Sequence, residues 1–180
     1  RSLHNIANAA PNARRVLLEG NHEDRLRRLI WGLPDKAKQL VRLREVEGAL
    51  RWPVLLDLQG VGFEWVPVNK QPTADVLPKM LATHGSRISP HAGYSARLEL
   101  EKYGHSGISG HTHRMATHSR RDYNGQSRWI EAGFVASYAQ PYGTVFNWQQ
   151  GIVVLEWSSD LKLMQEHLLF FRDGRVLWKA

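Results

Sequence analysis

The chain contains no cysteine, and this absence narrows the metal chemistry open to it. Without cysteine there is neither a disulfide framework nor a thiolate metal site. Any metal ion bound by these 180 residues must therefore be held by histidine, asparagine and carboxylate side chains. That donor set points to hydrolytic metals such as manganese, iron, zinc or magnesium.

Long apolar runs are also missing. No stretch approaches the roughly 20 apolar residues that a membrane span needs, and the basic N-terminus lacks the continuous apolar segment of a signal peptide. No linker rich in glycine, serine or proline divides the chain. We therefore expect one soluble domain over residues 1–180, located in the cytoplasm, with no membrane partner.

Acidic residues are fewer than basic ones, and the formal net charge is +7. A basic balance favours an anionic partner such as a phosphate ester or a nucleic acid. Much of the excess lies between Arg14 and Arg44, where a solvated helix face explains most runs of this kind. Composition therefore leaves a nucleic-acid partner open, and it says nothing about oligomeric state.

Hydrophobic periodicity and turn residues predict the elements of the first half of the chain. These elements are the end of a helix over 2–10, a strand over 15–19, a helix over 24–31, a second helix over 36–46, a helical turn over 55–58 and a short strand over 63–66. A loop bracketed by Pro67 and Pro72 is expected next.

The second half is predicted to become increasingly antiparallel. The expected elements are strands over 80–83, 106–109 and 151–157, a helix over 94–103, a hairpin of 114–121 with 128–131, and a final hairpin of 167–171 with 175–178. Asn124-Gly125 and Asp173-Gly174 are the predicted hairpin turns. The order of elements indicates a layered α/β domain with mixed sheets.

Three short motifs follow predicted strands. They are Gly20-Asn21-His22-Glu23, Thr83-His84-Gly85 and Gly110-His111-Thr112-His113-Arg114. Open α/β sheets bind ligands at the carboxyl ends of their strands, and glycine allows the tight turns needed there. Any one of these histidines alone is more often a hydrogen-bonded loop or core residue. Their joint recurrence at strand ends favours a shared site.

The residue types in these motifs suit a divalent metal. Asn21 offers an amide oxygen, and His84, His111 and His113 offer imidazole nitrogens. In a loop after a strand, His111 and His113 can diverge and serve two neighbouring ions. Two ions roughly 3.5–4 Å apart clamp phosphoryl oxygens and generate hydroxide, so phosphate ester hydrolysis is the natural use. His22 need not be a ligand and could protonate a leaving oxygen.

With these motifs the chain resembles the calcineurin-like metallophosphoesterases, in particular their small phage and prophage branch. The segments Trp129–Gly133 and Asn147–Gly151 reinforce the resemblance, which spans roughly residues 10 to 157. It implies an α/β sandwich of two mixed sheets flanked by helices. It also implies a dinuclear centre at the strand ends, with manganese favoured, in the cytoplasm of a bacterium or a phage-infected host cell.

The resemblance also implies a role for each matching residue. Asn21, His84 and His111 would hold the second metal, His113 would hold the first, and His22 would be the catalytic acid. Arg25 and Arg114 would contact phosphate oxygens, although both could equally be solvent-facing or structural.

The sequence departs from the family in one respect. The Asp-x-His and Gly-Asp motifs, which supply the first metal's ligands and the bridging carboxylate, do not occur in it. We therefore expect a domain truncated at its N-terminus by roughly 60 to 90 residues, or about two βα units. Without the bridging carboxylate, at most one weakly bound ion is expected, because two adjacent dications would repel.

The leading hypothesis is a metal-dependent phosphoesterase acting on a phosphomonoester or phosphodiester, inactive as this chain alone. A nuclease acting on DNA or RNA is the first alternative, and the basic balance favours it. The second is a catalytically dead, basic nucleic-acid-binding domain on the same scaffold.

Overall fold

The computed structural model describes residues 2–67, 73–136 and 147–176. The chain divides into two compact units, the N-terminal unit Arg1–Ala74 and the C-terminal unit Asp75–Ala180. Each unit is described below by itself, and a single domain over the whole chain stays a prediction. In the described part of the chain, every helix is too short or too polar to cross a membrane.

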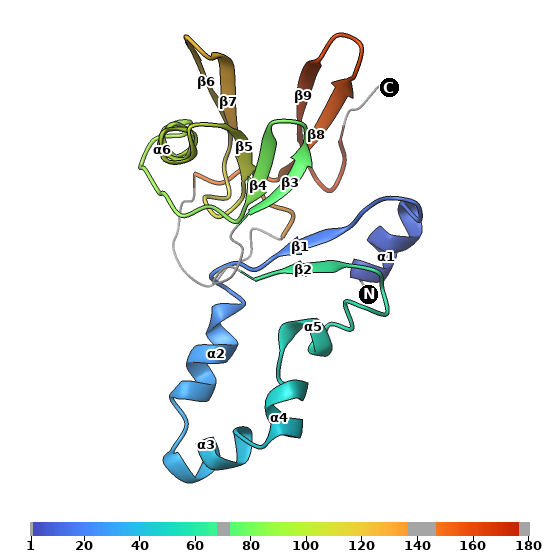
Figure 1. Ribbon diagram of the computed structural model, residues 1–180, viewed down its shortest axis with the longest axis vertical. Coiled ribbons are helices and arrows are strands. Elements are labelled where there is room, and N and C mark those ends of the chain that lie inside the picture. Colours follow the sequence, from blue (N-terminus) through green and yellow to red (C-terminus); the bar gives the residue numbers. More distant parts are fainter. Residues whose placement is uncertain (1, 68–72, 137–146, 177–180) are drawn as a thin grey trace. The chain divides into compact units, whose positions relative to one another are not determined.

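The N-terminal unit places helices between two short parallel strands (Figure 1). Its elements are α1 (Ser2–Ala9), β1 (Val16–Leu18), α2 (Asp24–Trp31), α3 (Asp35–Val41), α4 (Arg44–Ala49), α5 (Trp52–Leu55) and β2 (Glu64–Val66). Val16 pairs with Glu64 and Leu18 with Val66. Parallel strands need a crossover connection, and helices α2 to α5 supply it. The expected strands and the helix over 24–31 are therefore present.

The single helix expected over 36–46 is wrong, because α3 and α4 are separate. Leu43 is extended, with φ −60° and ψ 131°; its N–H donates to the Leu40 carbonyl at the end of α3, and its carbonyl accepts from the Glu47 N–H at the start of α4. Glu45 and Glu47 lie in the first turn of α4. Acidic residues there stabilise a helix N-terminus through the helix dipole. The spacing of apolar residues continues across this break, so the sequence pattern alone does not reveal it.

The C-terminal unit is built on a five-stranded sheet (Figure 1). Its strands in spatial order are β3 (Thr73–Leu77), β4 (Met80–Thr83), β5 (Ser106–Ser109), β7 (Gly125–Ala132) and β6 (Met115–Asp122). β5 is parallel to both β4 and β7, whereas β6 is antiparallel to β7. The sheet is therefore mixed. β3 begins directly after the expected loop, and no strand was expected there.

Helix α6 (Tyr94–Tyr103) packs on this sheet and forms the core of the unit. Ala96 and Leu100 on the helix contact Trp129 on β7, and all three are almost fully buried. The indole nitrogen of Trp129 donates to Ser109 Oγ at 2.9 Å. A side chain at Gly107 would place its Cβ 2.5 Å from the indole ring. Glycine is therefore required for the helix, the sheet and this tryptophan to pack together.

The hairpin between β6 and β7 forms, but its turn lies one residue earlier than predicted. Asp122 pairs with Gly125, so Tyr123 and Asn124 are the turn residues. The Asp122 carboxylate accepts a hydrogen bond from the Asn124 N–H at 2.9 Å, and Gly125 has a φ of 109°. Gly125 is therefore the first residue of β7, where the backbone needs a positive φ, and not a residue of the turn itself.

The last two strands also differ from expectation. β8 (Gly151–Ser158) pairs antiparallel with β9 (Leu163–Phe170) along their whole length. Around Asp173-Gly174 there is only an isolated bridge between Arg172 and Arg175, and residues 177–180 lie outside the described residues. Long pairing with β8 satisfies more backbone groups of β9 than the short predicted hairpin would.

The α/β class is confirmed. The described residues form one mixed sheet covered by α6, a parallel pair β1–β2 and an antiparallel pair β8–β9.

Candidate functional site

Strands β4 and β5 bring two of the predicted histidines together. The strands are parallel neighbours with Thr83 opposite Ser109, so the residues that follow them leave the sheet at the same edge. His84 Nε2 lies 3.0 Å from His111 Nδ1, and the ring centroids are 4.9 Å apart. Both side chains are half-buried. Parallel pairing therefore turns a separation of 27 residues into direct contact.

The backbone at His111 and His113 is unusual. Their φ angles are 62° and 59°, in the left-handed region that residues other than glycine seldom adopt. Thr112 lies between them, and its N–H donates to the Gly110 carbonyl at 2.7 Å. Such conformations persist only where surrounding structure supports them, and they are concentrated at functional sites.

The two imidazoles of this loop have different surroundings. His111 lies against His84, whereas the ring of His113 stacks on Phe134 at 5.4 Å and meets Trp148 edge-on at 4.6 Å. Within the described ranges, no group of three or more histidine, aspartate or glutamate side chains is placed to hold a metal. The structure therefore gives a histidine pair, with His113 in a separate aromatic setting.

Gly85 is needed for the pair to form. Its φ is 99°, and an added Cβ would lie 3.2 Å from His111 Cβ and 3.3 Å from Ser109 Cβ. Both contacts are tighter than side chains normally tolerate. The glycine of the Thr83-His84-Gly85 motif thus lets the His84 loop turn and approach the His111 loop closely.

The histidine pair fits two ligands of a single ion. Metal–nitrogen bonds of about 2.0–2.1 Å at tetrahedral or octahedral angles place adjacent donor nitrogens about 2.9–3.4 Å apart. The observed separation of 3.0 Å lies in that interval. Because the described residues group no carboxylate with this pair, the donor set does not fit a dinuclear centre.

The first motif belongs to the N-terminal unit. Asn21, His22 and Arg25 are exposed in the loop after β1 and at the start of α2. Glu23 holds this loop through its carboxylate, which accepts from the Gly20 N–H at 2.8 Å, and through its carbonyl, which accepts from the Trp52 indole at 2.7 Å. The histidine pair lies in the other unit, so convergence of Asn21 with it stays a prediction.

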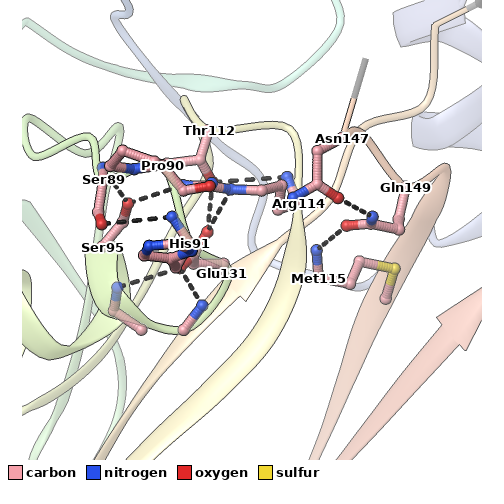
Figure 2. Close-up of polar contacts among 12 residues, drawn as sticks. Ser89, Pro90, His91, Ser95, Thr112, Arg114, Met115, Glu131, Asn147 and Gln149 are labelled. Atoms are coloured by element: carbon pink, nitrogen blue, oxygen red, sulfur yellow. Dashed lines mark hydrogen bonds and ion pairs between the residues drawn. The ribbon is translucent and has the colours of Figure 1, made fainter. Parts of the chain in front are cut away.

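Arg114 is buried in a structural network. Its guanidinium donates to the Pro90 carbonyl at 3.2 Å and to Ser95 Oγ at 2.9 Å, and its Nε lies 3.4 Å from the Glu131 carboxylate (Figure 2). Only 5% of Arg114 is exposed. These contacts favour the structural reading of Arg114 that the sequence left open over a phosphate contact, whereas Arg25 remains exposed.

Two buried glutamates lie beside the histidine loops, and neither was predicted from the sequence to have a role. Glu131 lies on β7 and Glu99 on α6, and each is almost fully buried. A carboxylate within the apolar run Trp129-Ile130-Glu131-Ala132 was a usable signal, since a charge on a central strand needs a buried partner. The run supported the family resemblance but received no role of its own.

Comparison with known proteins gives two solved structures. No family model and no curated protein matches the chain. A single mutant of Vps29 from Entamoeba histolytica has a TM-score of 0.46 at 14% identity, covering 96% of this chain and 84% of its own. Wild-type Vps29 from the same organism, complexed with Zn²⁺, has a TM-score of 0.42 at 16% identity, covering 68% and 71%. Likeness at this level assigns no role to any residue.

Proposed function

We propose that this chain carries the histidine part of a metal-dependent phosphoesterase site, in which His84 and His111 hold one divalent ion. The observation that carries the proposal is the 3.0 Å approach of their ring nitrogens at the ends of adjacent parallel strands. The order of the three motifs and the family resemblance support it. The substrate class is a phosphomonoester or a phosphodiester.

The remaining donors are assigned by the resemblance. The resemblance gives Asn21 as a ligand of the same ion, His113 as a ligand of the family's other ion and His22 as the acid that protonates the leaving oxygen. A bound divalent ion polarises a phosphoryl oxygen and lowers the pKa of its water. One ion is proposed rather than two, because neutral imidazoles and an amide cannot offset the repulsion between adjacent dications. Manganese is the favoured metal.

Metal titration tests the proposal directly. Calorimetry with Mn²⁺ and with Zn²⁺ is expected to show one site in the unsubstituted chain, and His84→Ala and His111→Ala should each abolish it. His105→Ala is the matched control, because this histidine belongs to the same unit and its Nδ1 contacts the carbonyl of the neighbouring residue Ser106 at 3.0 Å. Undiminished binding by His84→Ala would refute the assignment of the pair.

Turnover tests the enzymatic part. Little release of nitrophenol from mono- or bis-nitrophenyl phosphate is expected from the 180-residue chain with Mn²⁺, because it has no Asp-x-His or Gly-Asp motif. Full manganese-dependent turnover would show that an aspartate of this chain supplies the missing ligand. The better of the two substrates would then separate monoesterase from diesterase.

A nucleic-acid substrate is the second candidate, and a cavity in the N-terminal unit favours it. The cavity measures about 710 Å³, and Trp31, Trp52 and Trp65 line it together with Arg27, Arg42 and Arg51. Tryptophan faces stack on nucleobases, and arginines contact phosphates. Three glutamates also line the cavity and offset much of its positive charge. The tryptophan rings therefore favour nucleic-acid binding more strongly than the charge does.

Binding of a labelled single-stranded oligonucleotide at several salt concentrations tests this candidate. Trp31→Ala should weaken binding, whereas Leu29→Ala should not. Both residues are about equally exposed on α2, with 68% and 67% of their surface accessible, but only Trp31 lines the cavity. Equal affinities for the two variants would remove the cavity as the binding surface.

A further inference from the structure

Two buried carboxylates have no role in the proposed chemistry. Glu131 is 0% exposed and Glu99 is 1% exposed. An ionised carboxylate is seldom buried unless several donors compensate for the lost hydration. The groups that donate hydrogen bonds to each glutamate therefore indicate which part of the chain that glutamate stabilises.

Glu131 holds the loop that carries His111 and His113. One of its oxygens accepts from Thr112 Oγ1 at 2.7 Å, and the other accepts from the N–H groups of Gly93 and Ala96, both at 3.1 Å (Figure 2). Thr112 is the residue between the two left-handed histidines. Its side chain thus ties the strained part of the loop to the start of α6.

Glu99 holds the loop that carries His84 in a similar way. Its Oε1 accepts from the N–H of Ser86, from the N–H of Arg87 at 2.7 Å and from Ser86 Oγ at 3.2 Å. Ser86 and Arg87 follow His84 and Gly85 directly. The carboxylate therefore secures the chain just after the glycine turn that brings His84 to His111.

Helix α6 is the frame common to both loops. Glu99 is part of the helix, and Glu131 binds its first turn. Ser95, at the start of the helix, adds a third link, because its hydroxyl accepts from the Ser89 N–H and from Arg114, both at 2.9 Å. The histidine loops are thus anchored to one helix that is itself packed on Trp129.

We infer that Glu131 and Glu99 are positioning residues, Glu131 for the His111–His113 loop and Glu99 for the His84 loop. This inference rests on the proposed function for its biological meaning, but the geometry it describes can be measured without metal or substrate. Each glutamate acts through a different loop, so His113 should respond to Glu131 and not to Glu99, whereas His84 and His111 contact each other and can respond to both. A merely structural role would lower stability without that selectivity.

The test uses nitrogen NMR of the histidine rings in the metal-free chain. Glu131→Gln should shift the ring signals of His111 and His113, because glutamine loses the negative charge that faces Arg114 and weakens the hydrogen bond accepted from Thr112. Glu99→Gln should shift the signals of His84 and change those of His113 least. Glu101→Gln, an exposed glutamate on the same helix, is the control and should leave all three rings unchanged. A uniform shift in both variants, or none in either, would overturn the inference.

A second pair of variants applies if the glutamine variants do not fold. Thr112→Val removes the hydroxyl that donates to Glu131 while keeping the shape of the side chain, and Thr112→Ser restores the hydroxyl. The ring signals of His111 and His113 should move in Thr112→Val and return in Thr112→Ser. Failure of serine to restore them would contradict a role for the Thr112–Glu131 bond.

Metal affinity separates this inference from the proposed function. Loss of a partner that orients ligands typically weakens metal binding about 10- to 100-fold, and we expect that loss for Zn²⁺ with Glu131→Gln. If the unsubstituted chain binds no Zn²⁺, the proposed function fails, and the NMR comparison still decides the positioning roles. If it binds Zn²⁺ and Glu131→Gln binds equally well, the positioning role fails alone.

Discussion

The helices of the two units are buried to different degrees. Helix α6 of the C-terminal unit buries Ser95, Ala96, Glu99 and Leu100, whereas α3, α4 and α5 of the N-terminal unit bury none of their residues. Several large apolar side chains of the N-terminal helices are exposed, namely Leu29, Trp31, Leu40, Val54 and Leu55. The core of that unit consists instead of residues after α5 and on β2, such as Leu58, Val61 and Val66.

This difference extends to the candidate site. The histidine loops of the C-terminal unit are held by buried carboxylates on a packed helix, which fixes their geometry before any ligand binds. The Asn21-His22 loop is exposed, and Glu23 holds it through the Gly20 N–H and the Trp52 indole. We conclude that the histidine loops of the C-terminal unit are preorganised whereas the Asn21-His22 loop of the N-terminal unit is not held in this way, and the following variants test that contrast.

The largest effect is expected in the core of the C-terminal unit. Trp129→Ala should lower the free energy of unfolding by about 3–5 kcal/mol, because it leaves a cavity beneath Ala96 and Leu100. Leu40→Ala on α3, where the side chain is 65% exposed, should change it by no more than about 0.5 kcal/mol. Urea unfolding monitored by circular dichroism measures both. Equal losses would mean that the N-terminal helices are packed as firmly as α6.

The next effect concerns two glycines with positive φ. Gly85→Ala and Gly104→Ala should each cost about 1–2 kcal/mol, because both residues are left-handed or nearly so. Nothing lies within 4 Å of a Cβ at Gly104, whereas a Cβ at Gly85 would press on His111. Only Gly85→Ala should therefore also weaken Zn²⁺ binding in calorimetry. A similar loss of affinity in Gly104→Ala would show that stability, and not the approach of the histidines, governs binding.

A smaller effect is expected in the exposed Asn21-His22 loop of the N-terminal unit. Trp52→Phe removes the indole that donates to the Glu23 carbonyl, a hydrogen bond worth about 0.5–1.5 kcal/mol. The loop should open more often, so trypsin should cleave after Arg25 faster than in the unsubstituted chain. Trp157→Phe, on β8, is the control and should leave that rate unchanged. An unchanged rate in Trp52→Phe would show that the loop does not depend on this bond.

The smallest effect concerns a surface ion pair. A hydrogen bond from Arg97, at 2.8 Å, lowers the pKa of the Glu101 carboxyl below its ordinary value of 4.5. Because the pKa is lower in the folded protein, the ion pair stabilises the fold at pH values above 4.5. This contribution is lost as the pH falls through the lowered pKa. Arg97→Ala should raise the pKa of Glu101 and flatten this part of the stability profile. Carbon NMR titration of the carboxyl groups measures the change, and Arg121→Ala should have no such effect.

Elements whose signals are local were predicted well. The bounds expected for 24–31, 80–83, 94–103 and 106–109 coincide with α2, β4, α6 and β5. Helix α6 ends at Gly104, which has a φ of 62°. Glycine adopts this left-handed conformation more readily than any other residue, so it commonly ends a helix. Edge strand β3, the break between α3 and α4 and the exact turn of the β6–β7 hairpin were not predicted, because strand pairing and backbone geometry, rather than residue pattern alone, set these positions.

The sequence by itself determined which side chains could take part in the site and the order in which they follow strands. The glycines beside His84 and His111 and the absence of cysteine were sufficient for a histidine-based site to be expected. Tertiary structure decided that His84 and His111 meet, that His113 lies among aromatic rings and that Arg114 is buried. It also decided that Glu99 and Glu131 hold the loops. Periodicity reports which face of an element is buried, whereas a buried charge finds its partners only when distant segments are brought together.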